Sequence, residues 1–208
     1  MKRDEDQLPT EPYATKRLLD LGVLVLAAVP ALIVGGLCAA WITLTSRGGV
    51  FFRQERIGLN GAPFEVWKFR TMFAGDNPIF PDDTRITAPG RFLRRFSLDE
   101  LPQLINVARG EMSIVGPRPT LAYQVERYDD RQRRRLDVKP GLTGLAQVSG
   151  RNSLSWPERI EFDLEYVRTQ SLRTDLVLIL RTIWTLVSGD GVEGHPTDDP
   201  LAADLSEP

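Results

Sequence analysis

Uncharged and mostly apolar residues fill the stretch from Leu21 to Thr45. As a helix that rises about 1.5 Å per residue, this stretch is long enough to cross a hydrocarbon core of about 30 Å. It is too long for the apolar region of a cleavable signal peptide, and it lacks a clear small-residue cleavage site. The pattern therefore predicts a retained membrane segment.

Basic residues flank this segment on both sides. They are Lys16 and Arg17 before it, and Arg47, Arg53 and Arg56 after it. Positive flanks favour the cytoplasmic side of a membrane, and Pro30 inside the segment removes a helix hydrogen bond. Two topologies stay open on these grounds: a kinked helix that re-enters the cytoplasmic face, and an ordinary single span with a tolerated proline.

Beyond the segment, the alternation of side chains predicts a β-hairpin. Two runs rich in aromatic and β-branched residues, Val50 to Ile57 and Phe64 to Thr71, are joined by a turn that contains Asn60-Gly61. In the second strand, Lys68 and Arg70 fall on one face about 7 Å apart, a spacing that suits a diphosphate. A pair of solvated strand charges is an equally good interpretation.

Two later stretches have the apolar period of amphipathic helices. The first runs from Arg91 toward Val107 and the second from Leu172 to Val187. Their apolar stripes consist of Phe92, Leu93, Phe96, Leu101, Leu104 and Ile105 in the first, and of Leu176, Ile179, Leu180, Ile183, Trp184 and Val187 in the second. Such helices lie in a membrane interface or pack on a protein core, and the stripe is the same in both cases.

The first of these stretches contains two adjacent acids, Asp99 and Glu100. Ser97 with Glu100 three residues later has the spacing of a capping box, in which both side chains satisfy backbone N–H groups at a helix start. Pro102 weakens that register, because proline is disfavoured past the first turn. Capping alone is therefore an incomplete explanation of the acidic pair.

The arginines near this pair favour a chemical role. Arg94 precedes Asp99 by five residues, and Arg118 lies between two prolines that restrict its backbone. A guanidinium held in this way presents a preorganised fork to phosphate oxygens. Adjacent helical side chains point about 100° apart, so we expect the two carboxylates to act separately. One would attack phosphorus, while the other holds a hard cation such as Mg²⁺.

Two further features are weak when taken alone. The stretch from Lys139 to Gly150 is rich in glycine and hydroxyls, so its backbone N–H groups can approach a phosphate or a base, although it is not a Walker loop. The second feature is a group of arginines that either meet anionic lipid headgroups or form a solvated face balanced by nearby acids. These arginines are Arg131, Arg133, Arg134 and Arg135.

Composition narrows the function class. The 208 residues carry a formal net charge of -2, but residues 190–208 hold six acids and no lysine or arginine, so the remainder carries +4. This modest charge, beside an apolar anchor, argues against a nucleic-acid binder. Cys38 is the only cysteine, which excludes an intramolecular disulfide and fits a cytoplasm-facing protein. The only histidine, His195, lies in the acidic tail, so histidine catalysis is not expected.

These motifs, in this order, resemble the bacterial sugar transferases, which are monotopic phosphoglycosyl transferases. The likeness runs from Tyr13 to about Ser188. It is carried by Lys16 to Asp20, Phe51 to Gly58, Lys68 to Met72, Ser97 to Gln103, Gly116 to Pro119 and Lys139 to Gly144. Several long motifs in one order are very improbable by chance.

The resemblance implies transfer of a sugar 1-phosphate from a UDP-sugar to polyprenol (undecaprenyl) phosphate, with release of UMP. This reaction initiates the synthesis of exopolysaccharide, O-antigen, capsule or glycoprotein glycans. Asp99 would be the nucleophile of a covalent intermediate, and Glu100 would assist through Mg²⁺ or by orientation, so both are candidate Mg²⁺ ligands. The expected phosphate- and substrate-binding residues are Lys68, Arg70, Arg94, Arg118, Lys139, Thr143 and Gln147.

The resemblance also implies an α+β organisation at the cytoplasmic face of the bacterial inner membrane. We expect a flexible N-terminus (1–12), a re-entrant membrane helix broken at Pro30 (13–47), a catalytic domain with a β-hairpin and interfacial amphipathic helices (48–188), and an acidic disordered tail (189–208). Val29 stands before Pro30, where family members commonly have serine. Membrane lipids, a second copy of the chain and downstream glycosyltransferases are the other expected partners. The alternative is a catalytically silent scaffold that binds nucleotide sugars.

Overall fold

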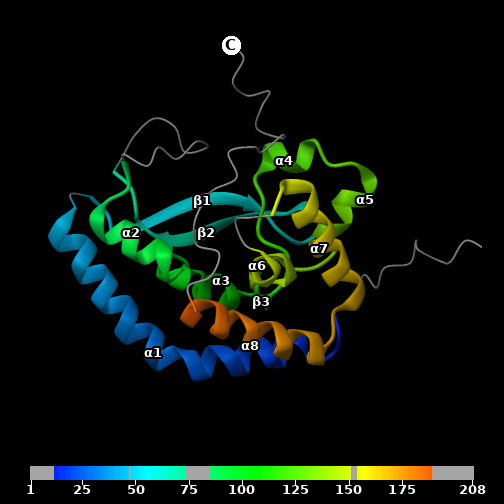
Figure 1. Cartoon of the computed structure of the whole chain (residues 1–208), viewed down its shortest axis with the longest axis horizontal. Coiled ribbons are helices and arrows are strands. Elements are labelled where there is room, and N and C mark those ends of the chain that lie inside the picture. The colour runs from blue at the N-terminus through cyan, green and yellow to red at the C-terminus, as the bar shows by residue number, and fades with distance from the viewer. Residues whose placement is uncertain (1–11, 47, 74–84, 151–153, 189–208) are drawn as a thin grey trace, which may run out of the picture.

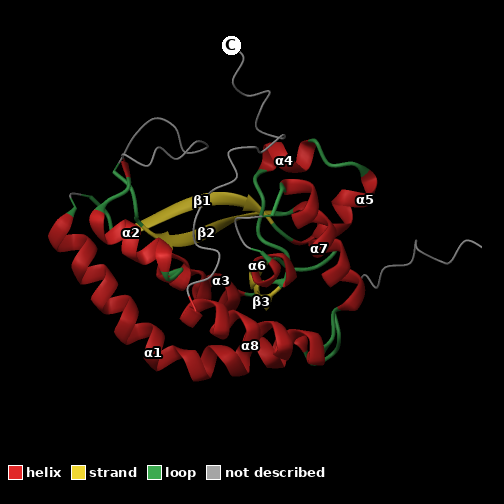
Figure 2. Ribbon diagram, viewed as in Figure 1, coloured by secondary structure: helices red, strands yellow, loops and turns green. Residues whose placement is uncertain are grey.

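The computed structural model describes residues 12–46, 48–73, 85–150 and 154–188, and the expectations for the two chain ends fall outside these ranges, except at Pro12. Helices surround two small sheets, which confirms the α+β class (Figure 2). The elements are α1 (Lys16–Thr45), β1 (Phe51–Ile57), η1 (Leu59–Gly61), β2 (Pro63–Phe69), α2 (Ala88–Arg95), η3 (Leu98–Gln103), α3 (Leu104–Arg109), β3 (Ser113–Val115), α4 (Ala122–Glu126), α5 (Asp130–Arg133), η4 (Arg134–Leu136), β4 (Gly141–Thr143), α6 (Leu145–Ser149), α7 (Trp156–Thr169) and α8 (Leu172–Ser188).

Helix α1 contains the predicted apolar segment and continues through Pro30. It is long and apolar enough to cross a membrane by length and composition. In Figure 1 it bends along its length, with the rest of the protein on its concave side. The proline, which lacks an N–H donor, lies in the middle of this bent helix. Apolar side chains on this middle part are exposed: Val25, Leu26, Val29, Leu32, Ile33 and Leu37.

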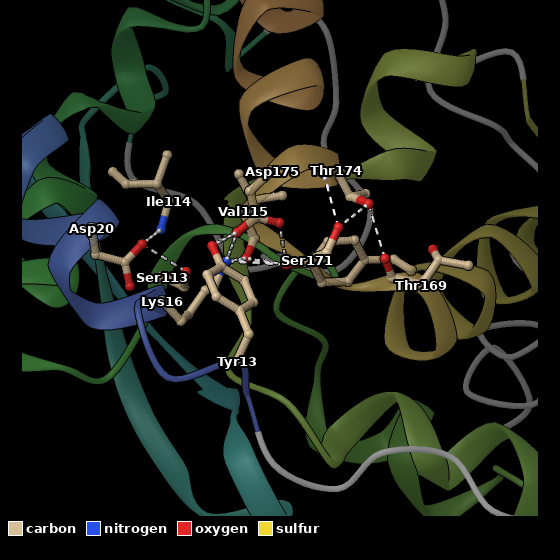
Figure 3. Close-up of polar contacts among 11 residues, drawn as sticks. Tyr13, Lys16, Asp20, Ser113, Ile114, Val115, Thr169, Ser171, Thr174 and Asp175 are labelled. Carbon is tan, nitrogen blue, oxygen red and sulfur yellow. Dashed lines mark hydrogen bonds and ion pairs between the residues drawn. The ribbon is translucent and has the colours of Figure 1, made fainter.

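The N-terminal end of α1 is bound to the protein by buried polar contacts (Figure 3). Lys16 Nζ donates to the carbonyl oxygen of Val115 at 2.7 Å and forms an ion pair with Asp175 of α8. One turn later, the Asp20 carboxylate accepts hydrogen bonds from the Ser113 hydroxyl at 2.8 Å and from the Ile114 N–H at 2.9 Å. Residues i and i+4 share a helix face, so both side chains reach strand β3 together.

The C-terminal end of α1 is bound to the same body by apolar packing. Cys38 and Ile42 are buried in a cluster with Phe69 of β2 and Leu93 of α2. Cys38 has no disulfide partner. Both ends of the long helix therefore rest on one folded unit, while its middle is exposed.

The predicted hairpin is confirmed. Strands β1 and β2 pair antiparallel, with Phe51 opposite Phe69 and Ile57 opposite Pro63. At the turn, Asn60 has a φ of 55° and Gly61 a φ of 78°. Asparagine and glycine tolerate this left-handed backbone better than other residues do, which explains why the dipeptide marks the turn.

The single helix predicted from Arg91 toward Val107 is wrong. The stretch forms α2, η3 and α3, and the chain leaves helical geometry at Ser97, whose φ is 54°. A left-handed φ in a residue other than glycine redirects the chain and is uncommon outside functional sites and turns. Leu93 before the break, and Leu101 and Leu104 after it, pack against the protein, so the apolar period runs across the break and did not reveal it. The other predicted stripe residues, Phe92, Phe96 and Ile105, are exposed.

Helix α8 is confirmed where it was predicted, and most of its apolar stripe is exposed, although Ile179 packs against the core. Leu176, Leu180, Ile183 and Trp184 are exposed. The opposite face is buried, with Asp175 and Leu178 at 0% and 2% exposure. This buried face joins the main core, which also contains Val107, Met112, Ile114, Val115, Val138, Tyr166 and Val167.

Candidate active site

Glu100 lies at the start of η3 and is held by two cations from other elements. Lys68 Nζ of β2 donates to Glu100 Oε1 at 2.8 Å. The Arg118 guanidinium donates to the same oxygen at 2.6 Å and to Oε2 at 3.4 Å. Burial of Glu100 opposes its ionisation, but the charges of Arg118 and Lys68 outweigh burial and hold its pKa well below the usual range.

Asp99, the neighbouring residue, has a different environment. Within the described part of the chain its carboxylate has no hydrogen bond and no ion pair. Burial, and then the negative charge of Glu100, raises the pKa of Asp99 against the opposing charges of Lys68, Arg118 and Arg94. Asp99 is therefore the more basic of the two carboxyls, and its oxygens are available to a substrate.

The capping box considered for this pair is absent. Ser97 makes no capping hydrogen bond through its side chain, and the Glu100 carboxylate points to Lys68 and Arg118 instead of back to the helix start. The left-handed backbone of Ser97 is incompatible with the extended geometry of a usual N-cap residue. The acidic pair is thus explained by its cations and not by helix capping.

Arg118 reaches Glu100 from a segment that follows strand β3. This strand pairs in parallel with β4, and the Gly116 N–H donates to the Thr143 carbonyl at 2.8 Å. A Cβ atom on Gly116 would lie 2.4 Å from the Lys139 carbonyl oxygen, and one on Gly144 would lie 2.2 Å from the Gly116 carbonyl oxygen. The glycines of the stretch from Lys139 to Gly150 therefore permit close backbone packing against this segment, a use that their sequence did not indicate.

Two more arginines contribute charge to this region. Arg94 donates from Nε to the Thr71 hydroxyl at 3.0 Å, and its charge acts on Asp99. Arg56 of β1 donates to the Pro119 carbonyl at 3.4 Å. Burial, and then the charge of Arg118, lowers the pKa of Arg56 to about 10, so it is charged at neutral pH.

Arg56 was not among the predicted site residues. The side-chain alternation of each strand, combined with the pairing of the hairpin, could have indicated it. Register places Arg56 opposite Phe64 and Phe52 opposite Lys68, so both cations lie on the same face. With Arg94 and Arg118, four cations surround two carboxylates. This excess of positive charge suits a substrate with several negative charges.

The other predicted substrate-binding residues lie elsewhere. The Arg70 guanidinium lies beside Gly48, one residue beyond the end of β2 at Phe69. Lys139 Nζ lies beside Gly110. Within the described residues, neither cation forms an ion pair with the acidic pair.

Thr143 and Gln147 lie behind the Arg118 segment. The Thr143 hydroxyl is hydrogen-bonded to the Thr182 hydroxyl of α8 at 2.7 Å and is buried. Both polar atoms of the Gln147 amide are buried without a partner in the described residues, next to Gly144. Their proposed contact with the donor stays a prediction.

The two carboxylates fit Mg²⁺ in one binding mode. Among the described residues there is no group of three or more acidic, cysteine or histidine side chains that would form a protein cage. Mg²⁺ commonly needs only one or two carboxylates when substrate phosphates supply further oxygens. Asp99 and Glu100 offer that number, so an ion that arrives with a diphosphate is compatible with the site.

Fold and site together define an anchored α+β protein with two adjacent carboxylates, of which Glu100 is held by two cations, in a region with an excess of positive charge. The chain belongs to the bacterial sugar transferase family, which matches residues 12–189. It is therefore a sugar transferase, as its sequence motifs implied.

Relatives with related names cover most of the chain. The uncharacterized sugar transferase EpsL of Bacillus subtilis is 40% identical over 181 residues, which are 86% of this chain and 90% of the relative. The exopolysaccharide production protein ExoY of Rhizobium meliloti is 42% identical, over 76% of this chain and 81% of its own. The UDP-glucose:undecaprenyl-phosphate glucose-1-phosphate transferase of Caulobacter vibrioides is 42% identical, over 84% and 70%.

Proposed function

We propose that this chain transfers a sugar 1-phosphate from a UDP-sugar to polyprenol phosphate and releases UMP, as the first step of exopolysaccharide or related glycan synthesis. The observation that carries the proposal is the Asp99 carboxylate, which has no partner among the described residues, beside Glu100, which two cations hold. The names of relatives that act on UDP-glucose or undecaprenyl phosphate support the same substrates.

The reaction proceeds in two displacements at one phosphorus atom. A carboxylate oxygen of Asp99 attacks the phosphorus that carries the sugar, and the bond from this phosphorus to the bridging oxygen breaks, so UMP leaves with the electron pair. An oxygen of polyprenol phosphate then attacks the same phosphorus. The bond to Asp99 breaks, which restores the carboxylate and yields the polyprenyl diphosphate sugar.

The cations stabilise charge during both displacements. Arg118 is half exposed and can turn part of its fork toward phosphate oxygens while Glu100 orients it. Lys68, Arg94 and Arg56 add positive charge around the reacting phosphorus. Mg²⁺, when bound, would neutralise the diphosphate, and Glu100 and Asp99 are the side chains that would hold it.

We place the apolar face of the protein in the cytoplasmic leaflet of the inner membrane. Exposed aromatic rings join α1 to α2, with centroids 5.5 Å apart for Trp41 and Phe92 and 4.8 Å apart for Phe92 and Phe96. Figure 1 shows α8 beside α1, and its exposed stripe includes Trp184. An exposed apolar area that extends over several helices fits a lipid surface.

The attachment of α1 supports re-entry and not a crossing. Lys16 and Asp20 at one end, and Cys38 and Ile42 at the other, are bound to the same folded body. A helix that crossed the bilayer would leave its two ends on opposite sides, and one body of this size cannot hold both. The bent middle then dips into one leaflet with its exposed apolar side chains.

An assay of UMP release tests the proposed reaction. The full chain, in membranes, is incubated with undecaprenyl phosphate and in turn with UDP-glucose, UDP-galactose, UDP-N-acetylglucosamine and UDP-N-acetylgalactosamine. We expect UMP release, dependent on the lipid for multiple turnovers, with at least one of these donors. Binding of a UDP-sugar without UMP release would favour the silent scaffold instead.

Cysteine labelling tests the topology. In a Cys38→Ser background, Ala14→Cys and Gly49→Cys place thiols at exposed positions before and after α1. We expect an impermeant maleimide to label both only after the inner membrane is permeabilised. Labelling of either thiol in intact spheroplasts would contradict re-entry and restore the single span.

A further inference from the structure

The backbone from Val115 to Arg118 is held at both ends by buried ion pairs. At the first end, Lys16 donates to the Val115 carbonyl, and at the other, Arg135 Nη2 donates to the Arg118 carbonyl at 3.1 Å. Each cation is itself paired with a buried carboxylate. Four elements that are distant in sequence thus meet on one short segment.

Arg135 is the more direct of the two contacts. Its side chain is 3% exposed and forms an ion pair with Asp163 of α7, which is 2% exposed. The guanidinium also donates to the Tyr128 hydroxyl at 2.5 Å. Its neighbour Arg131 pairs instead with the exposed Glu161. Arg135 therefore belongs neither to a lipid-facing cluster nor to a solvated face, the two interpretations drawn from its sequence.

Lys16 connects the same segment to the membrane helix. Its three donor directions meet the Val115 carbonyl at 2.7 Å, the Tyr166 hydroxyl at 3.0 Å and the Asp175 carboxylate (Figure 3). Tyr13 donates to the same carboxylate at 2.8 Å. An ammonium group has three N–H donors, so this buried charge is fully satisfied.

Between these two ends the backbone is hydrogen-bonded to strand β4 and its flank. The Gly116 N–H donates to the Thr143 carbonyl, and the Gly141 N–H donates to the Pro117 carbonyl, both at 2.8 Å. The Arg118 side chain, by contrast, is half exposed and contacts Glu100. The position of its guanidinium therefore depends on the backbone from which it extends.

We propose that Lys16 and Arg135 are positioning residues for Arg118: each anchors one end of the segment that aims this guanidinium at Glu100 and the donor phosphates. The inference rests on the proposed function, because it requires Arg118 to act in the transfer. Arg118 contacts Glu100 through two guanidinium nitrogens, and such a contact is sensitive to small displacements. A shift of about 1 Å in a positioned group can cost about 100-fold in rate. Because Lys16 belongs to α1, the proposal also makes the position of the membrane helix on the protein a part of the active-site geometry.

A double-mutant cycle separates positioning from general stability. Arg135→Lys and Lys16→Met are made alone and together with Arg118→Ala in the full chain, and kcat and KM are measured with the active UDP-sugar of the panel. Arg131→Lys, in the same stretch but exposed, is the matched control. Thermal unfolding is recorded for each variant. Arg135→Lys keeps a charge beside Asp163, so it carries the test if Lys16→Met does not fold.

We expect Arg135→Lys to lower kcat/KM about tenfold with Arg118 present, and less than about twofold in the Arg118→Ala background, because the residue it positions is then gone. Arg131→Lys should change neither. Equal losses in both backgrounds, or no loss with Arg118 present, would overturn the inference and leave the proposed function intact. If the unaltered enzyme releases no UMP with any donor, the proposed function fails, and this inference fails with it.

Discussion

Asp99→Asn is expected to reduce UMP release by about 10⁴-fold or more, because the amide cannot act as the attacking carboxylate. The covalent sugar-phosphate intermediate should disappear with it. Two measurements follow the intermediate directly: the intact mass of the protein after incubation with UDP-sugar alone, and exchange of labelled UMP into UDP-sugar without the lipid acceptor. Asp130→Asn, which removes an exposed acid from α5, is the matched control.

The same substitution should leave the fold intact or slightly more stable. The raised pKa of Asp99 means that the folded protein disfavours its charge relative to the unfolded chain. Stability from this carboxyl is therefore greatest when it is neutral and declines as pH rises through the range between its unfolded and folded pKa. A neutral isostere removes that cost at neutral pH. Substantial activity in Asp99→Asn, or its failure to fold, would contradict the assigned role.

Arg118→Ala is expected to lower kcat/KM about 100-fold or more at neutral pH, the usual size of the loss when one charge-stabilising donor is removed. Two functions would be lost together, because Arg118 holds Glu100 and, in the proposed reaction, also faces the donor. Kinetics with the active UDP-sugar provide the measurement. Arg131→Ala, which breaks an exposed ion pair with Glu161, should remain within about twofold of the unaltered enzyme.

The pH dependence of kcat/KM provides a second test with the Arg118→Ala variant. The charge of Arg118 is the largest influence that holds the pKa of Glu100 low, so its removal should raise that pKa. The charge of Arg118 also lowers the pKa of Asp99, the nucleophile, which takes up a proton before Glu100 does as pH falls. Removal of Arg118 should therefore raise both pKa values and move the acidic fall in kcat/KM upward. A profile that keeps its shape and position would mean that Arg118 does not influence the charge of this pair.

The candidate site was partly predictable because its residues lie in short motifs. Asp99, Glu100 and Arg118 were expected to act together, and the structure brings Glu100 and Arg118 into contact. Lys68 joins them because strand alternation placed it on the inner face of the hairpin. Arg70 does not, since its guanidinium lies beside Gly48.

The burial of individual charged side chains was much less predictable from the sequence than the contacts between motif residues. Arg135 and Lys16 each look like surface cations in the sequence, and each is buried against an aspartate that is distant in the chain. Charged residues are almost never fully buried unless they are paired, so the presence of a partner decides whether such a side chain is buried or exposed. Sequence spacing offered one signal only: Lys16 and Asp20 lie four residues apart on one helix face.

The sequence by itself determined the apolar helix, the hairpin with its Asn-Gly turn and the apolar stripe of α8 as a pattern, and it indicated the candidate residues for the chemistry. These depend on local backbone preference and on side-chain periodicity, which act over a few residues. Only the tertiary structure decided the break at Ser97, the direction of the α8 stripe and the environments that make Asp99 and Glu100 unequal. Burial and Coulomb interaction depend on distance in space, and the groups that set them come from β1, β2, α2 and the segment after β3.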